Sequence, residues 1–148
     1  MAQLRCEDVM SRRPRTCTPT DSLLDGIRLM KEIDVGFVPV CEQLDGQLVG
    51  VLTDRDIAMA MARDDKPSQL FVRDIMTRAP YTCAPSDALE QCTRLMEQEQ
   101  VRRVPIIDDA RSLVGVVSMA DVARHAPHRQ ELESQIARAE EAICQPSA

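Results

Sequence analysis

Aromatic residues are almost absent from this chain of 148 residues, which holds two Phe, one Tyr and no Trp. So few rings exclude a surface of the kind that stacks the bases of single-stranded nucleic acids. Positive charge is also scarce: 18 Lys and Arg stand against 24 Asp and Glu, and the formal net charge is −6. A generally basic surface for nucleic acid is therefore not expected.

Long hydrophobic runs are missing as well. No stretch approaches the roughly 20 apolar residues that cross a bilayer. No basic segment followed by an apolar one opens the chain, so nothing indicates export. We therefore expect a cytoplasmic protein without a membrane partner. Its length fits one average domain, or two very small ones that share a core.

Six cysteines are present, and none of them forms a Cys-x-x-Cys pair. Only His125 and His128 could add imidazole ligands, so the spacing does not indicate a structural zinc site. In a chain without an export signal, the simplest interpretation is reduced and mostly buried thiols. No metal site is assigned from the sequence.

An internal duplication is the main feature of the sequence. DVMSRRPRTCTPTDSL returns as DIMTRAPYTCAPSDAL, VGFVPV as VRRVPI, and LVGVLTDRDI as LVGVVSMADV. The segments recur in the same order: 8–23 as 74–89, 35–40 as 101–106, and 48–57 as 113–122. Such self-similarity indicates two copies of one structural unit.

Each copy predicts the element order β-α-β-β-α. The expected strands are 15–17, 37–40 and 48–52 in the first copy and 81–83, 103–107 and 113–117 in the second. Thr20 and Ser86 are expected to N-cap the helices that follow the first strands, and Thr53 and Ser118 stand where the last helices begin. The Asp45–Gly46 pair is typical of a hairpin turn between two strands.

The expected fold class is α/β (α+β), with the two repeats packed as one pseudo-two-fold module. A unit of about 55–60 residues buries too little apolar surface to be stable alone, which favours packing of the two copies against each other. The expected boundaries are a first repeat at 6–63, a linker at 64–71, a second repeat at 72–126 and a C-terminal helical tail at 127–148.

A hydroxyl residue and an aspartate stand three positions apart where each last helix begins. Thr53 precedes Asp56, and Ser118 precedes Asp121. This spacing is that of a capping box, which stabilises a helix start without any ligand. A helix start also presents N–H groups and a positive dipole end to an anion. The hydroxyls could then donate to a phosphate while the aspartates accept from sugar hydroxyls, and both interpretations stay open.

With these junctions the repeats resemble the CBS domain, the cystathionine-beta-synthase motif, and two in tandem resemble a Bateman module. The resemblance rests on Val-Pro-Val before the hairpin and on the Gly-to-Asp motif after it, and it covers roughly residues 6–126. The segments EQVRRVPII at 99–107 and ADVARHAP at 120–127 further resemble small stand-alone CBS proteins of the hypoxic-response type.

The resemblance implies a small-molecule ligand and a role in regulation. It implies that an adenosine-type nucleotide, such as AMP or ATP, binds in a cleft between the repeats and that modules pair into dimers. It further implies that Asp56 and Asp121 hold ribose hydroxyls, while Thr53 and Ser118 approach phosphate.

Arginines distinguish the two copies. Arg102 and Arg103 precede Val-Pro in the second copy, where the first has Gly36 and Phe37. The resemblance implies basic contacts to phosphate from this position, and the alternative is a pair of solvated surface arginines. Arg55, beside the acid of the first junction, is a further candidate for phosphate because the second copy has alanine there.

The leading hypothesis is a ligand-sensing binding module that is not an enzyme and requires no cofactor. No Ser-His-Asp set, Walker-type loop or metal-ligand spacing is present. No catalytic domain accompanies the repeats, so an effector protein of unknown identity is expected to receive the signal.

The rival hypothesis is a redox-responsive or stress-related interaction protein without a nucleotide ligand. Cys17 ends the first predicted strand and Cys41 the second, and neighbouring strands lie about 4.8 Å apart. That separation permits a disulfide between Cys17 and Cys41 under oxidation. The second copy has Ile107 opposite Cys83, so the pair occurs once.

A homodimer is expected from the helix after Thr53. Residues 57–62, IAMAMA, are apolar all round, and a helix of this kind must bury two faces. Ile57, Ala60 and Met61 share the face expected against the chain's own sheet, which leaves Met59 for a second copy.

Overall fold

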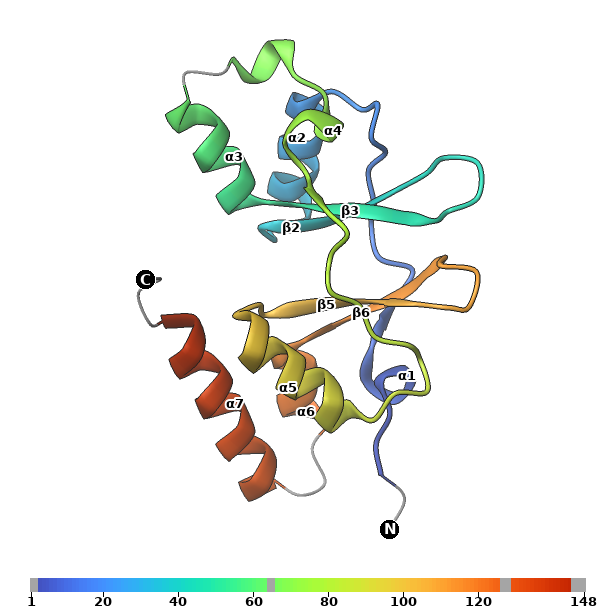
Figure 1. Ribbon diagram of the computed structural model, residues 1–148, viewed down its shortest axis with the longest axis vertical. Coiled ribbons are helices and arrows are strands. Elements are labelled where there is room, and N and C mark those ends of the chain that lie inside the picture. The colour runs from blue at the N-terminus through green and yellow to red at the C-terminus, as the bar shows by residue number, and fades with distance from the viewer. Residues whose placement is uncertain (1–2, 64–65, 126–128, 145–148) are drawn as a thin grey trace. The chain divides into compact units, whose positions relative to one another are not determined.

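The computed structural model describes residues 3–63, 66–125 and 129–144, with side chains left undescribed at 129–133, 135 and 144 (Figure 1). His128 therefore lies outside the described residues. The chain forms two compact units. We call Pro14–Pro80 with Ala110–Leu113 the N-terminal unit. The C-terminal unit comprises the residues up to Arg13, Tyr81–Asp109 and the residues from Val114 onward.

The N-terminal unit is a small antiparallel sheet with helices on one side (Figure 1). Its sheet has the order β2-β3-β4, and in β2 and β3 Phe37 pairs with Thr53. Gly46 takes a positive φ of 69° in the hairpin between these strands, a conformation that glycine adopts at little cost. The elements are α2 (Leu23–Ile33), β2 (Phe37–Cys41), β3 (Leu48–Thr53), α3 (Asp54–Ala62), the 3₁₀ helix η1 (Pro67–Gln69), α4 (Val72–Ile75) and β4 (Thr77–Arg78).

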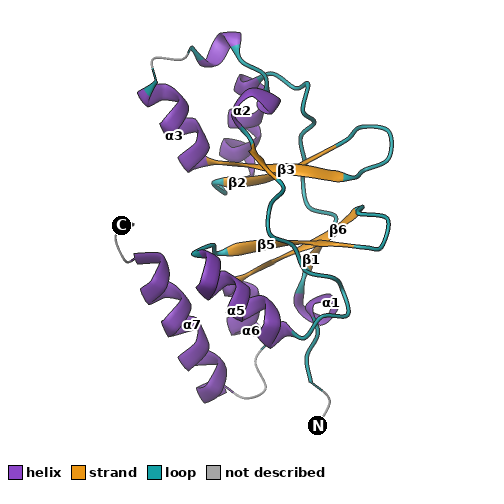
Figure 2. Ribbon diagram, in the orientation of Figure 1, coloured by secondary structure: helices purple, strands orange, loops and turns teal. Residues whose placement is uncertain are grey.

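The C-terminal unit repeats this plan, and its three-stranded sheet has the order β1-β6-β5 (Figure 2). The elements are α1 (Cys6–Val9), β1 (Ser11–Arg12), α5 (Leu89–Glu99), β5 (Arg103–Ile107), β6 (Leu113–Ser118), α6 (Met119–Arg124) and α7 (Arg129–Cys144). The predicted mixture of helices and strands, and the predicted positions of β2, β3, β5 and β6, are confirmed within one or two residues.

In each sheet, one of the two edge strands comes from the beginning of the other sequence copy: β1 in the C-terminal unit and β4 in the N-terminal unit. Ser11 in β1 pairs with Val116 in β6, whereas Arg78 in β4 pairs with Gly50 in β3. The sequence patterns did not predict β1 and β4. The strands expected at 15–17 and 81–83 are reduced to single parallel bridges, Cys17 to Val40 and Cys83 to Ile106. Proline on both sides of each segment explains this, because proline has no N–H to continue a ladder.

The helices after these bridges begin later than expected. Ser22 is the N-cap of α2 and its Oγ accepts from the N–H of Asp25 at 3.1 Å, while Ala88 precedes α5 without a side-chain cap. The assignment of Thr20 and Ser86 as caps is therefore wrong. The carboxylates of the neighbouring Asp21 and Asp87 accept from backbone N–H groups three residues upstream, which holds turns where the helices were expected to start.

Each unit has its own buried core. In the N-terminal unit the core is centred on Leu23, Val38, Val40, Leu52 and Val72, and in the C-terminal unit on Leu89, Met96, Val104, Ile106 and Val117. Helix α7 packs on α5 and α6 and buries Ala139 completely, so the tail covers its own unit. Within the part of the chain that the structure describes, no helix is both long and apolar enough to cross a membrane.

Candidate functional site

The N-terminal junction is the point where β3 ends and α3 begins. Thr53 Oγ1 accepts a hydrogen bond from the N–H of Asp56 at 3.1 Å, and the Asp56 carboxylate accepts one from the N–H of Thr53 at 3.0 Å. This reciprocal pair is the predicted capping box. The hydroxyl hydrogen of Thr53 is not used in the pair, so it is available to a ligand oxygen.

The first N–H groups of α3 already donate within the protein. The N–H of Asp54 donates to the Gly36 carbonyl at 3.1 Å, and that of Arg55 to the Asp54 carboxylate at 2.8 Å. The expectation of free N–H groups at this helix start is therefore wrong. An anion at this junction meets the Thr53 hydroxyl and the exposed Arg55 side chain rather than the backbone.

The Asp56 carboxylate can still accept hydrogen bonds from a ligand. Its side chain is half-buried, and Oδ1 accepts from the Thr77 hydroxyl at 2.9 Å. A carboxylate offers about four lone-pair sites, of which the capping bond and Thr77 use two. Sugar hydroxyls can therefore donate to the remaining sites.

The C-terminal junction, where β6 meets α6, repeats the capping box with a more enclosed acid. Ser118 Oγ accepts from the N–H of Asp121 at 3.1 Å, and Asp121 accepts from the N–H of Ser118 at 2.9 Å. Asp121 is only 4% exposed, and its second oxygen forms an ion pair with Arg124. Because it is buried and paired with a charged donor, this carboxylate is less accessible to a ribose hydroxyl than that of Asp56.

His125 has a structural position at the end of α6. Its Nδ1 lies 3.0 Å from the carbonyl oxygen of Asp121, which confirms the interpretation that this imidazole bonds a helix-end carbonyl.

Arg102 and Arg103 lie beside the C-terminal junction. The carbonyl of Arg102 accepts from the N–H of Met119, the first residue of α6, at 3.2 Å. Arg102 is exposed and Arg103 is half-buried, and neither forms a salt bridge with a described residue. Arg124 therefore contacts Asp121 directly, while Arg102 is joined to the start of the same helix through its backbone.

The equivalent place in the N-terminal unit has no arginines. Gly36 stands where the second copy has Arg102, and a Cβ atom on Gly36 would lie 2.5 Å from Oδ2 of Asp54. Asp54 and Asp56 outnumber Arg55 at this junction, so its local charge is negative, whereas the C-terminal junction is positive. Phosphate is therefore favoured at the C-terminal junction on electrostatic grounds.

Cys17 and Cys41 are neighbours on adjacent segments of the N-terminal unit. The N–H of Cys41 donates to the carbonyl of Cys17 at 2.9 Å, and both side chains are buried free thiols. Burial raises the pKa of Cys17 to about 12 and that of Cys41 to about 11. The thiols are therefore neutral near pH 7 and react slowly, since thiolate is the reactive form.

The C-terminal unit contains a group that sequence spacing missed. The sulfur atoms of Cys6, Cys83 and Cys92 all lie within 4.8 Å of one another, and all three side chains are buried. The residues are far apart in the chain and lie on α1, on the bridge before α5 and on α5. Alignment of the two copies could have given the signal, because Cys6 and Cys92 replace Val72 and Gly26.

The model of the CBS domain matches this chain twice, at residues 6–63 and 72–128. The chain belongs to the CBS domain family. Among curated proteins, the CBS domain-containing protein YhcV of Bacillus subtilis is 38% identical over 117 residues, covering 79% of this chain and 81% of that protein. Hypoxic response protein 1 of Mycobacterium tuberculosis is 34% identical over 142 residues, covering 95% and 94%.

Solved structures of CBS domain pairs share the fold. Hypoxic Response Protein I, solved with two coordinated zinc ions, matches with a TM-score of 0.75 at 32% identity, covering 84% of this chain and all of that one. CBSX2 of Arabidopsis thaliana, solved in complex with AMP, matches with a TM-score of 0.72 at 27% identity, covering 82% and 95%. The predicted resemblance to stand-alone CBS proteins of the hypoxic-response type is therefore confirmed.

Proposed function

We propose that this chain is a ligand-sensing regulatory module that binds an adenosine-type nucleotide, such as AMP, at its strand–helix junctions. The observation that carries the proposal is the hydroxyl–acid capping box, which occurs at the same place in both copies of a CBS domain pair. The ligand class is supported by CBSX2, a relative solved with AMP. The module acts without catalytic chemistry or a required cofactor, as a cytoplasmic homodimer that signals to an effector protein.

The two junctions differ in the groups that each offers to a nucleotide. Asp56 has unused lone pairs and only partial burial, so it is the better acceptor for ribose hydroxyls. Arg102 and Arg103 bring positive charge without a bonded carboxylate of their own, so they suit phosphate. Charge-assisted hydrogen bonds from guanidinium to phosphate are stronger than those between neutral groups. Selectivity for AMP over adenosine should therefore depend on the arginines.

Calorimetric titration with AMP, ATP and adenosine tests this proposal. The wild-type protein is expected to bind AMP more tightly than adenosine, and the double variant Arg102→Ala/Arg103→Ala should bind the two alike. Arg94→Ala is the matched control, since Arg94 is an exposed arginine of α5 in the same unit that pairs with Glu90. Absence of binding by any of these ligands at millimolar concentration would contradict the proposal.

A second candidate function is a redox-responsive interaction module, favoured by the adjacency of Cys17 and Cys41. Oxidation would join the two sulfur atoms with loss of two protons and two electrons to an added oxidant such as oxidised glutathione. Thiol counting under denaturing conditions, with and without that oxidant, measures whether Cys17 and Cys41 form a disulfide. Six free thiols after oxidation would exclude this function, whereas a loss of two that Cys41→Ala abolishes would support it.

A further inference from the structure

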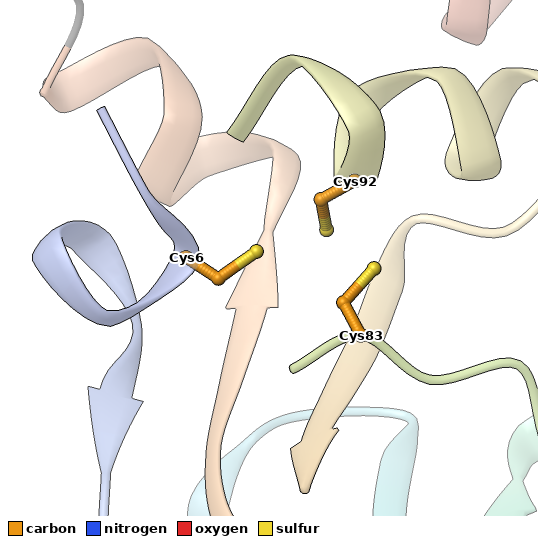
Figure 3. Close-up of side chains that lie close together, drawn as sticks. All are labelled: Cys6, Cys83 and Cys92. Carbon is orange, nitrogen blue, oxygen red and sulfur yellow. The ribbon is translucent and has the colours of Figure 1, made fainter. Parts of the chain in front are cut away.

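The triad formed by Cys6, Cys83 and Cys92 lies inside the core of the C-terminal unit. Figure 3 shows the three side chains turned toward one another from α1, from the segment before α5, and from α5. Their sulfur atoms lie within 4.8 Å of one another, and the side chains are 0%, 4% and 0% exposed, respectively. Among the residues with described side chains, no His, Asp or Glu joins this group.

The duplication shows that the fold does not require Cys6 or Cys92, whereas Cys83 has a cysteine, Cys17, at its equivalent position. The positions equivalent to Cys6 and Cys92 in the N-terminal unit are Val72 and Gly26. A Cβ atom on Gly26 would lie 2.8 Å from Leu52 Cδ2 and 3.4 Å from Val72 Cγ2, so Leu52 fills the space there. In the N-terminal unit, apolar side chains therefore fill the position that the thiols occupy in the C-terminal unit.

The C-terminal unit makes room for the third thiol instead. Its counterpart of Leu52 is the buried Val117, which is one carbon smaller. The shorter side chain leaves space that Cys92 can occupy beside Cys6 and Cys83. Three substitutions relative to the first copy thus act together to gather three sulfur atoms in one place.

The three thiols of the triad interact with one another in the core. Hydrogen bonds from Cys6 and Cys92 lower the pKa of Cys83, and the hydrogen bond to Cys83 raises the pKa of Cys6. These bonds and burial also raise the pKa of Cys92. The negative charge of Asp87 raises the pKa of Cys6 and Cys83, so no positive field offsets a thiolate there. A buried charge is costly unless it is paired or coordinates a metal.

The distances between the three sulfur atoms and the other ligands available in the core indicate which metal the triad would bind. With metal–sulfur bonds of about 2.3 Å, three sulfur atoms in one plane around an ion lie about 4.0 Å apart, which is compatible with the 4.8 Å limit on the distances between the sulfur atoms of the triad. Structural zinc sites have four protein ligands, which are usually Cys or His. Among the described side chains the triad supplies three ligands, and the core cluster that contains it also holds the thioethers of Met10, Met96 and Met119. Thiolate and thioether ligands favour Cu(I).

We propose that Cys6, Cys83 and Cys92 form a buried three-thiolate site for a soft monovalent metal ion, Cu(I). The ion enters as Cu(I), so no electron is transferred, and each thiol that becomes a ligand releases its proton to solvent. Affinity should therefore rise with pH as the protons of the triad compete less. This site is separate from the strand–helix junctions of the proposed nucleotide function.

Anaerobic titration of the full chain with Cu(I), in competition with a chromophoric chelator, tests the site. The wild-type protein is expected to take up one tightly bound Cu(I) at the triad. Loss of a group that only hydrogen-bonds a metal ligand already costs about 10–100-fold in metal affinity, so loss of a ligand itself in Cys92→Ala or Cys6→Val should cost at least about 100-fold. Cys6→Val places the residue of the first copy in the same setting, which favours correct folding.

The control is Cys17→Ala/Cys41→Ala, which removes two buried thiols outside the triad and should leave the tight site intact. X-ray absorption of the loaded wild-type protein should show three sulfur neighbours and no nitrogen or oxygen, independently of any variant. Equal loss of affinity in the control would overturn the proposal. So would a titration in which Zn²⁺ displaces Cu(I), or a metal bound with nitrogen ligands.

Discussion

Asp56 and Asp121 stand at equivalent positions of the two copies but differ in how far their oxygens are already bonded. Both accept a backbone N–H in a capping box. Asp56 has the neutral Thr77 hydroxyl as its other partner, whereas the buried Asp121 has the guanidinium of Arg124. An ion pair satisfies a carboxylate more fully than a hydroxyl does. The two copies therefore carry the same motif with unequal capacity for a ligand.

Replacement of Asp56 should weaken nucleotide binding more than replacement of Asp121. Hydrogen bonds to a charged acceptor contribute about 1.5–3 kcal/mol, so Asp56→Ala should lower AMP affinity roughly 10- to 100-fold. The control is Asp74→Ala, because Asp74 also caps a helix by accepting from the N–H of Phe71 at 2.8 Å. Calorimetric titration of Asp56→Ala, Asp121→Ala and Asp74→Ala with AMP checks this order of affinity losses. Equal losses in Asp56→Ala and Asp74→Ala would show that only capping was lost.

Buried thiols should make the protein less stable in alkali. The pKa values of Cys17 and Cys41 are raised from 9.0 to about 12 and 11, so between these limits the unfolded state has lost protons that the native state keeps. The free energy of unfolding then falls as pH rises, by about 1.4 kcal/mol per pH unit for each thiol. Below pH 9 both thiols are protonated in the native and the unfolded state, so their contribution to stability is fully present.

Urea denaturation between pH 8 and pH 11 measures this slope. Cys17→Ala should give a shallower decline than the wild type, with most of the difference above pH 9. The other ionisable groups, including the cysteines of the triad, Tyr81 and the two lysines, are the same in both proteins, so the difference between the slopes reports Cys17. Identical slopes in the two proteins would contradict the assignment.

At the scale of elements, short helices depend on their first residues. Helix α3 has nine residues and α6 has six, and each begins with a reciprocal capping box. Isolated helices of this length are marginal in water. Side-chain bonds at their starts satisfy N–H groups that have no partner within the helix. The residues at the strand ends therefore stabilise the helices as well as facing the candidate ligand.

Thr53→Ala should destabilise the protein by about 1 kcal/mol, the usual cost of an N-cap replaced by alanine. Thr53→Ser keeps the hydroxyl and should be close to the wild type. Chemical denaturation of the three proteins separates loss of the cap from loss of the methyl group. A Thr53→Ser variant as unstable as Thr53→Ala would show that packing of the methyl group, not capping, is responsible.

At the scale of the whole molecule, helix α3 presents an apolar surface to solvent. Met59 is 56% exposed and Met61 is 59% exposed, while Ala60 is buried. The expectation that Met61 packs on the chain's own sheet is therefore wrong, because Ile57 and Ala60 already fill that face. Two exposed methionines on one short helix fit an interface with a second copy, since Met adapts to irregular contacts.

Met59→Glu should convert the expected homodimer into a monomer. Burial of a carboxylate in an apolar contact without a partner is costly. Light scattering at micromolar concentration gives the mass of each protein. Leu44→Glu is the control, because Leu44 is fully exposed in the hairpin between β2 and β3 and should leave the dimer intact. A monomeric wild-type protein at this concentration would exclude the dimer.

Local patterns in the sequence determined most of the elements. Short continuous apolar runs and the Gly46 turn specify the β2–β3 hairpin, and Thr53 and Ser118 mark the starts of α3 and α6. These features depend on residues within a few positions of one another, so a repeated sequence predicts them twice. The membership in the CBS domain family followed from the same repeated motifs.

Only the tertiary structure decided which distant residues meet. Pairing of β1 with β6 and of β4 with β3 depends on contacts between separate copies, which local propensity does not encode. The gathering of Cys6, Cys83 and Cys92 arises in the same way. Spacing along the chain carries no record of such contacts, because they form only when whole elements pack against one another.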